Sequence, residues 1–178
     1  MTWWRGRSGV AHGVTRGAMR GHGVVTVAIT VMVAVCVVLL SGCGRSVPSD
    51  PEGTLDWVSG GTLRVGVSPD PPLVVAQAQE PSGALIDLAS GFADSVGAET
   101  QWTVGSEETL VGLLEDGDLD LVVGGFTDQT PWVDKAGATR GYTSIPGADG
   151  RSIVMLVPLG ENAMLTSLES FLDAEVGP

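Results

Sequence analysis

Several side chains that can hydrogen-bond a small molecule follow two adjacent glycines in the segment GGFTDQTPW, residues 124–132. Gly125 lets the backbone approach a ligand closely, and hydroxyl, carboxylate and amide groups follow it within five residues. A second polar group, Asp70, lies in SPDPP, where three prolines end a short β-rich run. A few polar groups gathered in this way are typical of a site that binds a small polar molecule.

The candidate ligand contacts in these two segments are Asp70, Pro72, Gly125, Thr127, Asp128, Thr130 and Trp132. Several of them have a purely structural alternative. The residues around Thr127 can form an ordinary polar turn, and Asp70 can simply begin one. Trp132 can stack on a ligand or cover an apolar face, and we favour the covering role.

The sequence contains few residues of the types that usually carry out catalysis. Both histidines, His12 and His22, precede residue 43, so a chain cut at that point excludes Ser-His-Asp and Cys-His catalysis. No phosphate-binding P-loop occurs, which leaves carboxylate or Tyr/Lys acid-base chemistry as the enzymatic option. We expect no catalysis and no cofactor.

The acidic segment DGDLD, residues 116–120, raises the question of a calcium site. An EF-hand loop needs Gly at its sixth position and Glu at its twelfth, and this sequence has Leu121 and Thr127 there. We therefore expect no metal, and place Asp118 and Asp120 at the solvated start of a strand.

The N-terminal region has the pattern of an export signal. Residues 1–23 contain four arginines and no acid, and residues 24–40 form an apolar run. A retained transmembrane helix is the alternative, although this run is at the short limit for crossing roughly 30 Å of hydrocarbon. The next segment, LLSGCG, resembles the lipobox of bacterial lipoproteins. That resemblance implies a signal peptide over residues 1–42 and an acylated Cys43, which would anchor the protein in the membrane.

The charge of the remaining chain limits its partners. After residue 42 there are 21 acids and five basic residues, which gives a net charge near −16. Such a charge argues against binding to nucleic acid or to an anionic membrane surface. Cys36 would leave with the signal, so Cys43 has no disulfide partner in the chain.

The hydrophobic pattern predicts a flexible tether over residues 43–60 and one α/β lobe over residues 61–178. Residues 133–150 are expected to be irregular. The expected strands are 62–67, 99–104, 119–123 and 152–157, and the expected helices lie within 83–97, 107–117 and 161–176. This alternation predicts an open, mostly parallel sheet with helices on both faces.

The order of these elements predicts where the polar groups meet. In an open parallel sheet, ligands bind outside the carboxyl ends of the strands, where the strand order reverses. Strands 62–67 and 119–123 would be neighbours. Asp70 and residues 124–132 are therefore expected at one edge of the sheet.

Four segments resemble, in sequence and spacing, the first lobe of the family 3 extracellular solute-binding proteins. They are LRVGVSPDPPL, GALIDLASGFADSVG, LLEDGDLDLVVGGFTDQT and TRGYT, within residues 61–143. The resemblance implies a single lobe of the type II periplasmic-binding fold, lipid-anchored at the extracytoplasmic face of the cell membrane. It also implies a small polar solute and an ABC permease, or another protein chain, as partners.

The sequence departs from the family pattern in three places. A second lobe is missing, and the tail resembles the element by which the family's chain returns to its first lobe. The arginine that clamps a ligand carboxylate in the family falls at Trp132, and the second hydroxyl of its Thr-x-Thr element falls at Gln129. These departures favour a neutral or cationic solute.

Two other functions are open at this point. The lobe can be an accessory or sensor module that docks a protein partner through the face of the missing lobe. It can also be a dehydratase-like enzyme of the same fold. An apolar patch around Trp132 would favour docking, and a polar cleft at the strand ends would favour solute binding.

Overall fold

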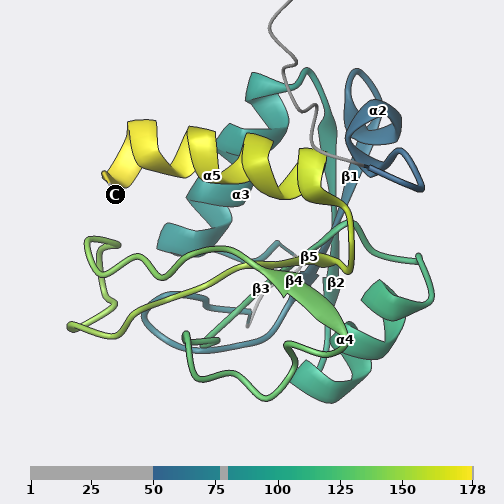
Figure 1. The fold of residues 1–178 in the computed structure, drawn as a ribbon. Helices are drawn as coiled ribbons and strands as arrows, with labels where there is room; N and C mark the ends of the chain where they lie inside the picture. Colours follow the sequence, from purple (N-terminus) through teal and green to yellow (C-terminus); the bar gives the residue numbers. More distant parts are fainter. Residues whose placement is uncertain (1–49, 77–79, 178) are drawn as a thin grey trace, which may run out of the picture. The chain divides into compact units, whose positions relative to one another are not determined.

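The structure of the protein is a computed structural model that describes residues 50–76 and 80–177 (Figure 1). The expected signal peptide and Cys43 lie outside these residues. No helix within the described ranges has the length and apolar character needed to cross a bilayer. The elements are α2 (Thr54–Val58), β1 (Thr62–Val67), α3 (Ala84–Ser95), β2 (Glu99–Val104), α4 (Glu107–Glu115), β3 (Leu121–Val123), β4 (Ala136–Ala138), β5 (Leu156–Pro158) and α5 (Asn162–Val176).

The strands form one open sheet in the order β2-β1-β3-β5-β4. Strand β1 pairs in parallel with β2 and with β3, through Val65↔Trp102 and Val65↔Leu121. Strand β5 is antiparallel to both β3 and β4, so four of the five strands run in one direction. The expected α/β fold with a mostly parallel sheet is confirmed.

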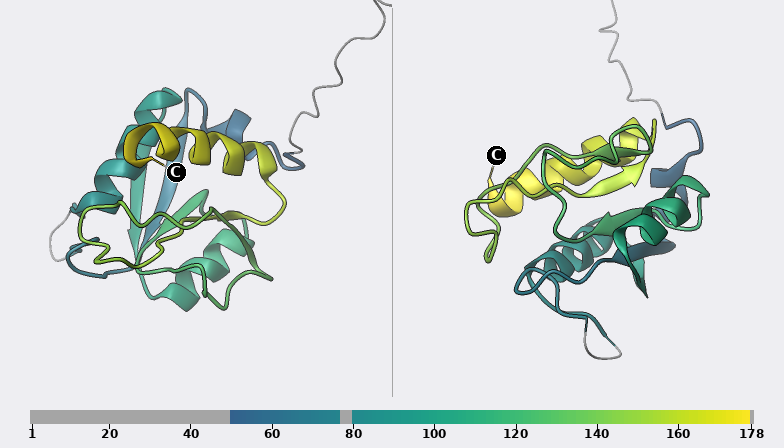
Figure 2. Two further views of the ribbon diagram at one scale, coloured as in Figure 1. Left: turned by 60° about the vertical axis from the view of Figure 1, so that its left-hand side comes forward. Right: turned by 90° about the horizontal axis from the view of Figure 1, so that it is seen from below.

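Both faces of the sheet are covered by helices (Figures 1 and 2). Successive side chains of a strand point to opposite faces, and β3 shows the result. Leu121 and Val123 join one hydrophobic cluster with α3 and α5, whereas Val122 joins a second cluster with α4. A strand that is apolar at every position is thus buried on both sides.

Helix α5 completes the first hydrophobic cluster. Met164, Leu168 and Leu172 are fully buried and recur at helical spacing. Phe171 meets Phe92 of α3 edge to face, with ring centroids 5.8 Å apart. The final helix is therefore part of the core of the lobe.

The region between β3 and α5 differs from the prediction. Residues 133–150 contain β4, whose sequence Ala-Gly-Ala has low strand propensity. Its small residues permit close packing, because a Cβ atom on Gly137 would lie 3.2 Å from Val157 Cγ2. The predicted strand 152–157 is shorter than expected. Its first half instead forms isolated bridges, in which Ile153 pairs with Thr127 and Tyr142.

The predicted tether contains helix α2, so for residues 54–58 the prediction of a flexible tether is wrong. Two carboxylates hold this helix beside the start of α5. Glu161 accepts hydrogen bonds from the N–H groups of Glu52 and Thr54, each at 3.0 Å. Asp50 accepts one from Leu55 at 2.9 Å and one from Met164 at 3.4 Å. We call these hydrogen bonds to the carboxylates of Asp50 and Glu161 the terminal latch, because they join the first and last helices of the lobe.

Asp120 is also placed differently from the prediction. Its side chain is only 5% exposed and pairs with Arg64 of β1, with Nη2 of Arg64 2.5 Å from Oδ1. The backbone N–H of Arg64 donates to Oδ2 at 2.8 Å. Burial is tolerated because the carboxylate is both paired and hydrogen-bonded. Asp118 is exposed, as expected.

Candidate functional site

Asp70 and Gly125 meet at the carboxyl ends of β1 and β3. The backbone of Asp70 exchanges two hydrogen bonds with Val74, at 3.1 and 3.0 Å, which fixes the turn after β1. A Cβ atom on Gly125 would lie 2.7 Å from Oδ2 of Asp70. Any larger residue at this position would displace the carboxylate, so glycine is required here for close approach.

Arg151 provides a positive charge at the same edge. Its Nη1 donates to Oδ2 of Asp70 at 2.8 Å, and its Nε donates to the carbonyl of Ala148 at 3.2 Å. The side chains of Arg151 and Asp70 are 37% and 29% exposed. The edge therefore presents one negative and one positive group side by side, and solvent reaches both.

The loop after Gly125 runs along the segment that follows Arg151. Val154 donates to the carbonyl of Phe126 at 3.0 Å, and Asp128 donates to the carbonyl of Ser152 at 3.1 Å. Thr127 forms an antiparallel bridge with Ile153. These bonds place Thr127, half-buried, and Asp128, exposed, on the strip of chain next to Arg151.

Thr130 and Trp132 belong to a different environment. Trp132 is half-buried and packs against the second hydrophobic cluster, as the covering interpretation predicts. Its Nε1 and the Oγ1 of Thr130 are buried without a hydrogen-bond partner among the described residues. Pro72 is exposed and lies against another loop, since a Cβ on Gly147 would be 2.9 Å from its Cγ.

The structure thus brings Asp70, Gly125 and Thr127 to one edge and adds Arg151, which the sequence did not single out. Arg151 lies 81 residues from Asp70 in a stretch with no periodic pattern. The available signal was weak: it is one of only five basic residues after residue 42.

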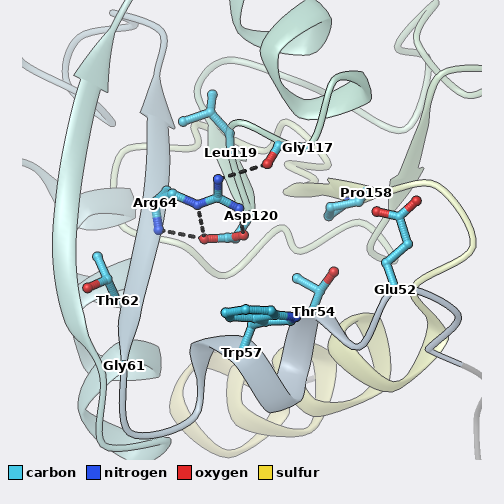
Figure 3. Close-up of a pocket in the computed structure, with 10 residues that line it drawn as sticks. All are labelled: Glu52, Thr54, Trp57, Gly61, Thr62, Arg64, Gly117, Leu119, Asp120 and Pro158. Carbon is cyan, nitrogen blue, oxygen red and sulfur yellow. Dashed lines mark hydrogen bonds and ion pairs between the residues drawn. The ribbon is translucent and has the colours of Figure 1, made fainter.

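A cavity of about 600 Å³ lies elsewhere, at the amino ends of β1 and β3 (Figure 3). None of the predicted ligand contacts lines this cavity. The Asp70 edge remains the candidate site on chemistry and topology, because it lies at the carboxyl ends of parallel strands. No group of three or more metal-binding side chains occurs in the described part of the chain.

Comparison with known families identifies the segment that builds this edge. Residues 63–145 match the bacterial extracellular solute-binding proteins, family 3. The match includes Asp70 and residues 124–132, whereas Arg151 and α5 lie beyond it. No curated protein sequence matches the chain.

Solved structures share the fold. Domain 1 of TmArgBP, in its arginine-bound form, is 23% identical with a TM-score of 0.57, over 67% of this chain and 97% of that one. An ancestral arginine-binding protein bound to arginine is 15% identical with a TM-score of 0.55, over 64% and 92%. The substrate-binding protein of an amino acid ABC transporter is 14% identical with a TM-score of 0.55, over 66% and 95%. The fold of the described residues matches a single lobe of a periplasmic binding protein.

Proposed function

We propose that the protein is a non-catalytic, one-lobed solute-binding module of the extracytoplasmic space. It binds a small neutral or cationic polar solute at the edge formed by Asp70, Gly125, Thr127 and Arg151. The observation that carries this proposal is the partly exposed Asp70–Arg151 pair, held against Gly125 where β1 and β3 end.

The chemistry of the edge suits a solute with an amino or guanidino group. The carboxylate of Asp70 accepts hydrogen bonds from such a cation, and charge-assisted bonds of this kind are stronger than neutral ones. Gly125 exposes the backbone nearby, and the hydroxyl of Thr127 lies in the adjoining loop. Arg151 provides a donor for an oxygen atom of the same solute, so a molecule carrying both groups matches the pair.

Relatives of the same fold support the choice of solute class. The solved domain 1 of TmArgBP is described as arginine-bound, and this chain covers 97% of it. Arginine is therefore the first solute to test. An ABC permease is the partner that we propose, because a protein of similar fold serves an amino acid ABC transporter.

Arginine is expected to bind with a dissociation constant of roughly millimolar, near −4 kcal/mol, because one lobe leaves one side of the solute in water. Asp70→Asn should weaken binding about tenfold, since it removes the charge and keeps the shape. Titration of the full chain in neutral detergent, followed by NMR, measures both values. Glutamate should bind worst in the same assay.

Asp149→Asn is the matched control, because it removes one charge from the loop that carries Arg151. Asp149 has a φ of 53°, which asparagine also tolerates, and its side chain is exposed. The Asp149→Asn substitution should leave the affinity for arginine unchanged. An equal loss of arginine affinity in Asp70→Asn and Asp149→Asn would overturn the proposed site. Sub-micromolar binding of glutamate would also overturn it.

We also propose that Cys43 is acylated and anchors the lobe at the outer side of the cell membrane. The support is the sequence LLSG directly before Cys43 at the end of the apolar run. Cys43→Ser should block processing, so that the longer precursor accumulates in the membrane fraction on an immunoblot. Normally processed protein from this variant, released into the medium, would argue against a lipoprotein.

A further inference from the structure

The cavity at the amino ends of β1 and β3 lies at the opposite ends of these strands from Asp70 (Figure 3). Its volume of about 600 Å³ is that of an ordinary small-molecule site. Trp57 of α2 lies across one side, the Arg64–Asp120 pair forms the other, and Glu52 stands at a third. None of these residues takes part in the proposed solute site, so the inference below is independent of it.

Trp57 is the most unusual residue of this cavity. It is 80% exposed, although tryptophan has a large apolar surface that proteins usually bury. Thr54 and Val58 of the same helix are buried, and the terminal latch holds the segment before it. The indole is thus exposed on a well-anchored helix. One face of its ring is directed into the cavity (Figure 3).

The charges around the cavity leave a negative excess. The guanidinium of Arg64 is already occupied, since Nε donates to Asp120 at 3.0 Å and Nη1 donates to the carbonyl of Gly117 at 2.8 Å. The Arg64–Asp120 pair is therefore neutral as a unit. The carboxylate of Glu52 has neither an ion pair nor a hydrogen bond in the part of the chain that the structure describes. The cavity consequently attracts cations and repels anions.

An aromatic face and an unpaired carboxylate in one cavity form a combination that recognises organic cations. The negative face of the indole attracts quaternary ammonium and guanidinium groups, and tryptophan is the best of the aromatic residues for this contact. Leu119 and Pro158 add apolar surface for the carbon atoms of such a ligand. A strongly hydrated metal ion would gain nothing from these apolar groups.

We propose that this cavity is a second binding site, which takes a small organic cation with a quaternary ammonium or guanidinium head. The head lies against the indole of Trp57, and the carboxylate of Glu52 balances its charge. The bound cation joins the segment before β1 to the loop between α4 and β3, from which Gly117 and Asp120 come.

The test is a titration of the full chain, in neutral detergent, with tetramethylammonium and with agmatine. Each tryptophan gives its own indole N–H signal in NMR spectra, and the Trp57 signal should shift and saturate with either cation. Trp57→Ala should weaken binding about tenfold, and Trp57→Phe less, because phenylalanine keeps a weaker π face. Glu52→Gln should weaken binding about threefold, since the exposed charge acts through solvent.

Two controls separate this site from the others. Trp102→Phe changes a half-buried tryptophan of β2 outside the cavity, and it should leave the affinity unchanged. Asp70→Asn should also leave it unchanged, although it weakens arginine binding at the other edge. Thermal unfolding of each variant verifies folding, and Trp57→Ala should melt normally because its side chain is exposed.

Two results together would support the second site even if arginine fails to bind at the Asp70 edge. The Trp57 signal shifts saturably in the native chain and in Asp70→Asn, and the backbone N–H signals of Gly117 and Leu119, which line the cavity, report weaker binding in Trp57→Ala. Three results would overturn it. The first is the absence of saturation with both cations, and the second is an affinity that Trp57→Ala leaves unchanged. The third is a shift of the Trp57 signal with sodium chloride that equals its shift with the organic cations, which would reveal general screening of charge.

Discussion

Deletion of the chain from Glu161 onward is expected to abolish cooperative unfolding. The deletion removes α5, whose Met164, Leu168 and Leu172 are fully buried in the larger cluster. Without them, the apolar faces of α3 and of the sheet would be exposed to water, and the remaining chain should be molten or insoluble. Leu168→Ala alone should cost about 2–5 kcal/mol, because the side chain is 0% exposed and leaves a cavity.

Chemical denaturation followed by circular dichroism measures both effects. Leu159→Ala is the matched control, since the same substitution is made where the side chain is 59% exposed, and it should cost far less. A cooperative transition that survives the deletion with its midpoint unchanged would show that the lobe does not need α5.

Glu161→Ala is expected to destabilise the lobe by about 2–4 kcal/mol, because it leaves two backbone N–H groups without their charged acceptor. The two N–H groups belong to Glu52 and Thr54. Loss of their hydrogen bonds to Glu161 should release α2 from α5. The control is Glu175→Ala, an exposed position on the same helix that loses the same charge. Equal unfolding free energies for the two variants would contradict a structural role for the terminal latch.

The loss of unfolding free energy caused by Glu161→Ala should depend on pH in two steps. Burial, followed by contact with Glu161, raises the pKa of Asp50. Burial alone would also raise the pKa of Glu161, but hydrogen bonds from Asp50 and from two backbone N–H groups outweigh it and lower that pKa. A raised carboxyl pKa favours the folded state as the pH falls, whereas a lowered one disfavours it.

The stability gap between the native protein and Glu161→Ala should therefore widen slightly on mild acidification, as Asp50 takes up its proton. It should then narrow as the pH falls below the ordinary glutamate pKa of about 4.3 and through the lower pKa of Glu161. Unfolding free energies measured in a pH series from 7 to 3 test this order. A gap that stays constant over the series would contradict it.

The sequence was informative where one periodic pattern decided the structure. Strand β1 and helices α3 and α5 follow from apolar periodicity, and the rule for parallel sheets correctly brought Asp70 close to Gly125. Burial of the sheet on both faces follows from β3, which is apolar at every position. These features are local, or depend on a single topological rule.

The features that the sequence did not reveal depend on contacts between distant segments. Arg151 approaches Asp70 only because the chain returns along the loop at Thr127. Strand β4 pairs with β5 although its Ala-Gly-Ala sequence has low strand propensity, and Gly137 permits the close approach of Val157. Asp120 is buried because Arg64 lies next to it on β1, 56 residues earlier. In each case a tertiary partner outweighed the local preference.

The terminal latch has a mechanical consequence. Any pull applied through the N-terminal segment reaches Asp50 and Glu161 before it reaches β1, which lies between two neighbours inside the sheet. Because Asp50 also accepts from Met164, part of this load passes directly into α5. Tension on a tethered lobe would thus be borne first by a short set of carboxylate contacts. Helix α2 would detach before the sheet opens, so the cavity that Trp57 lines would be lost while the Asp70 edge kept its shape.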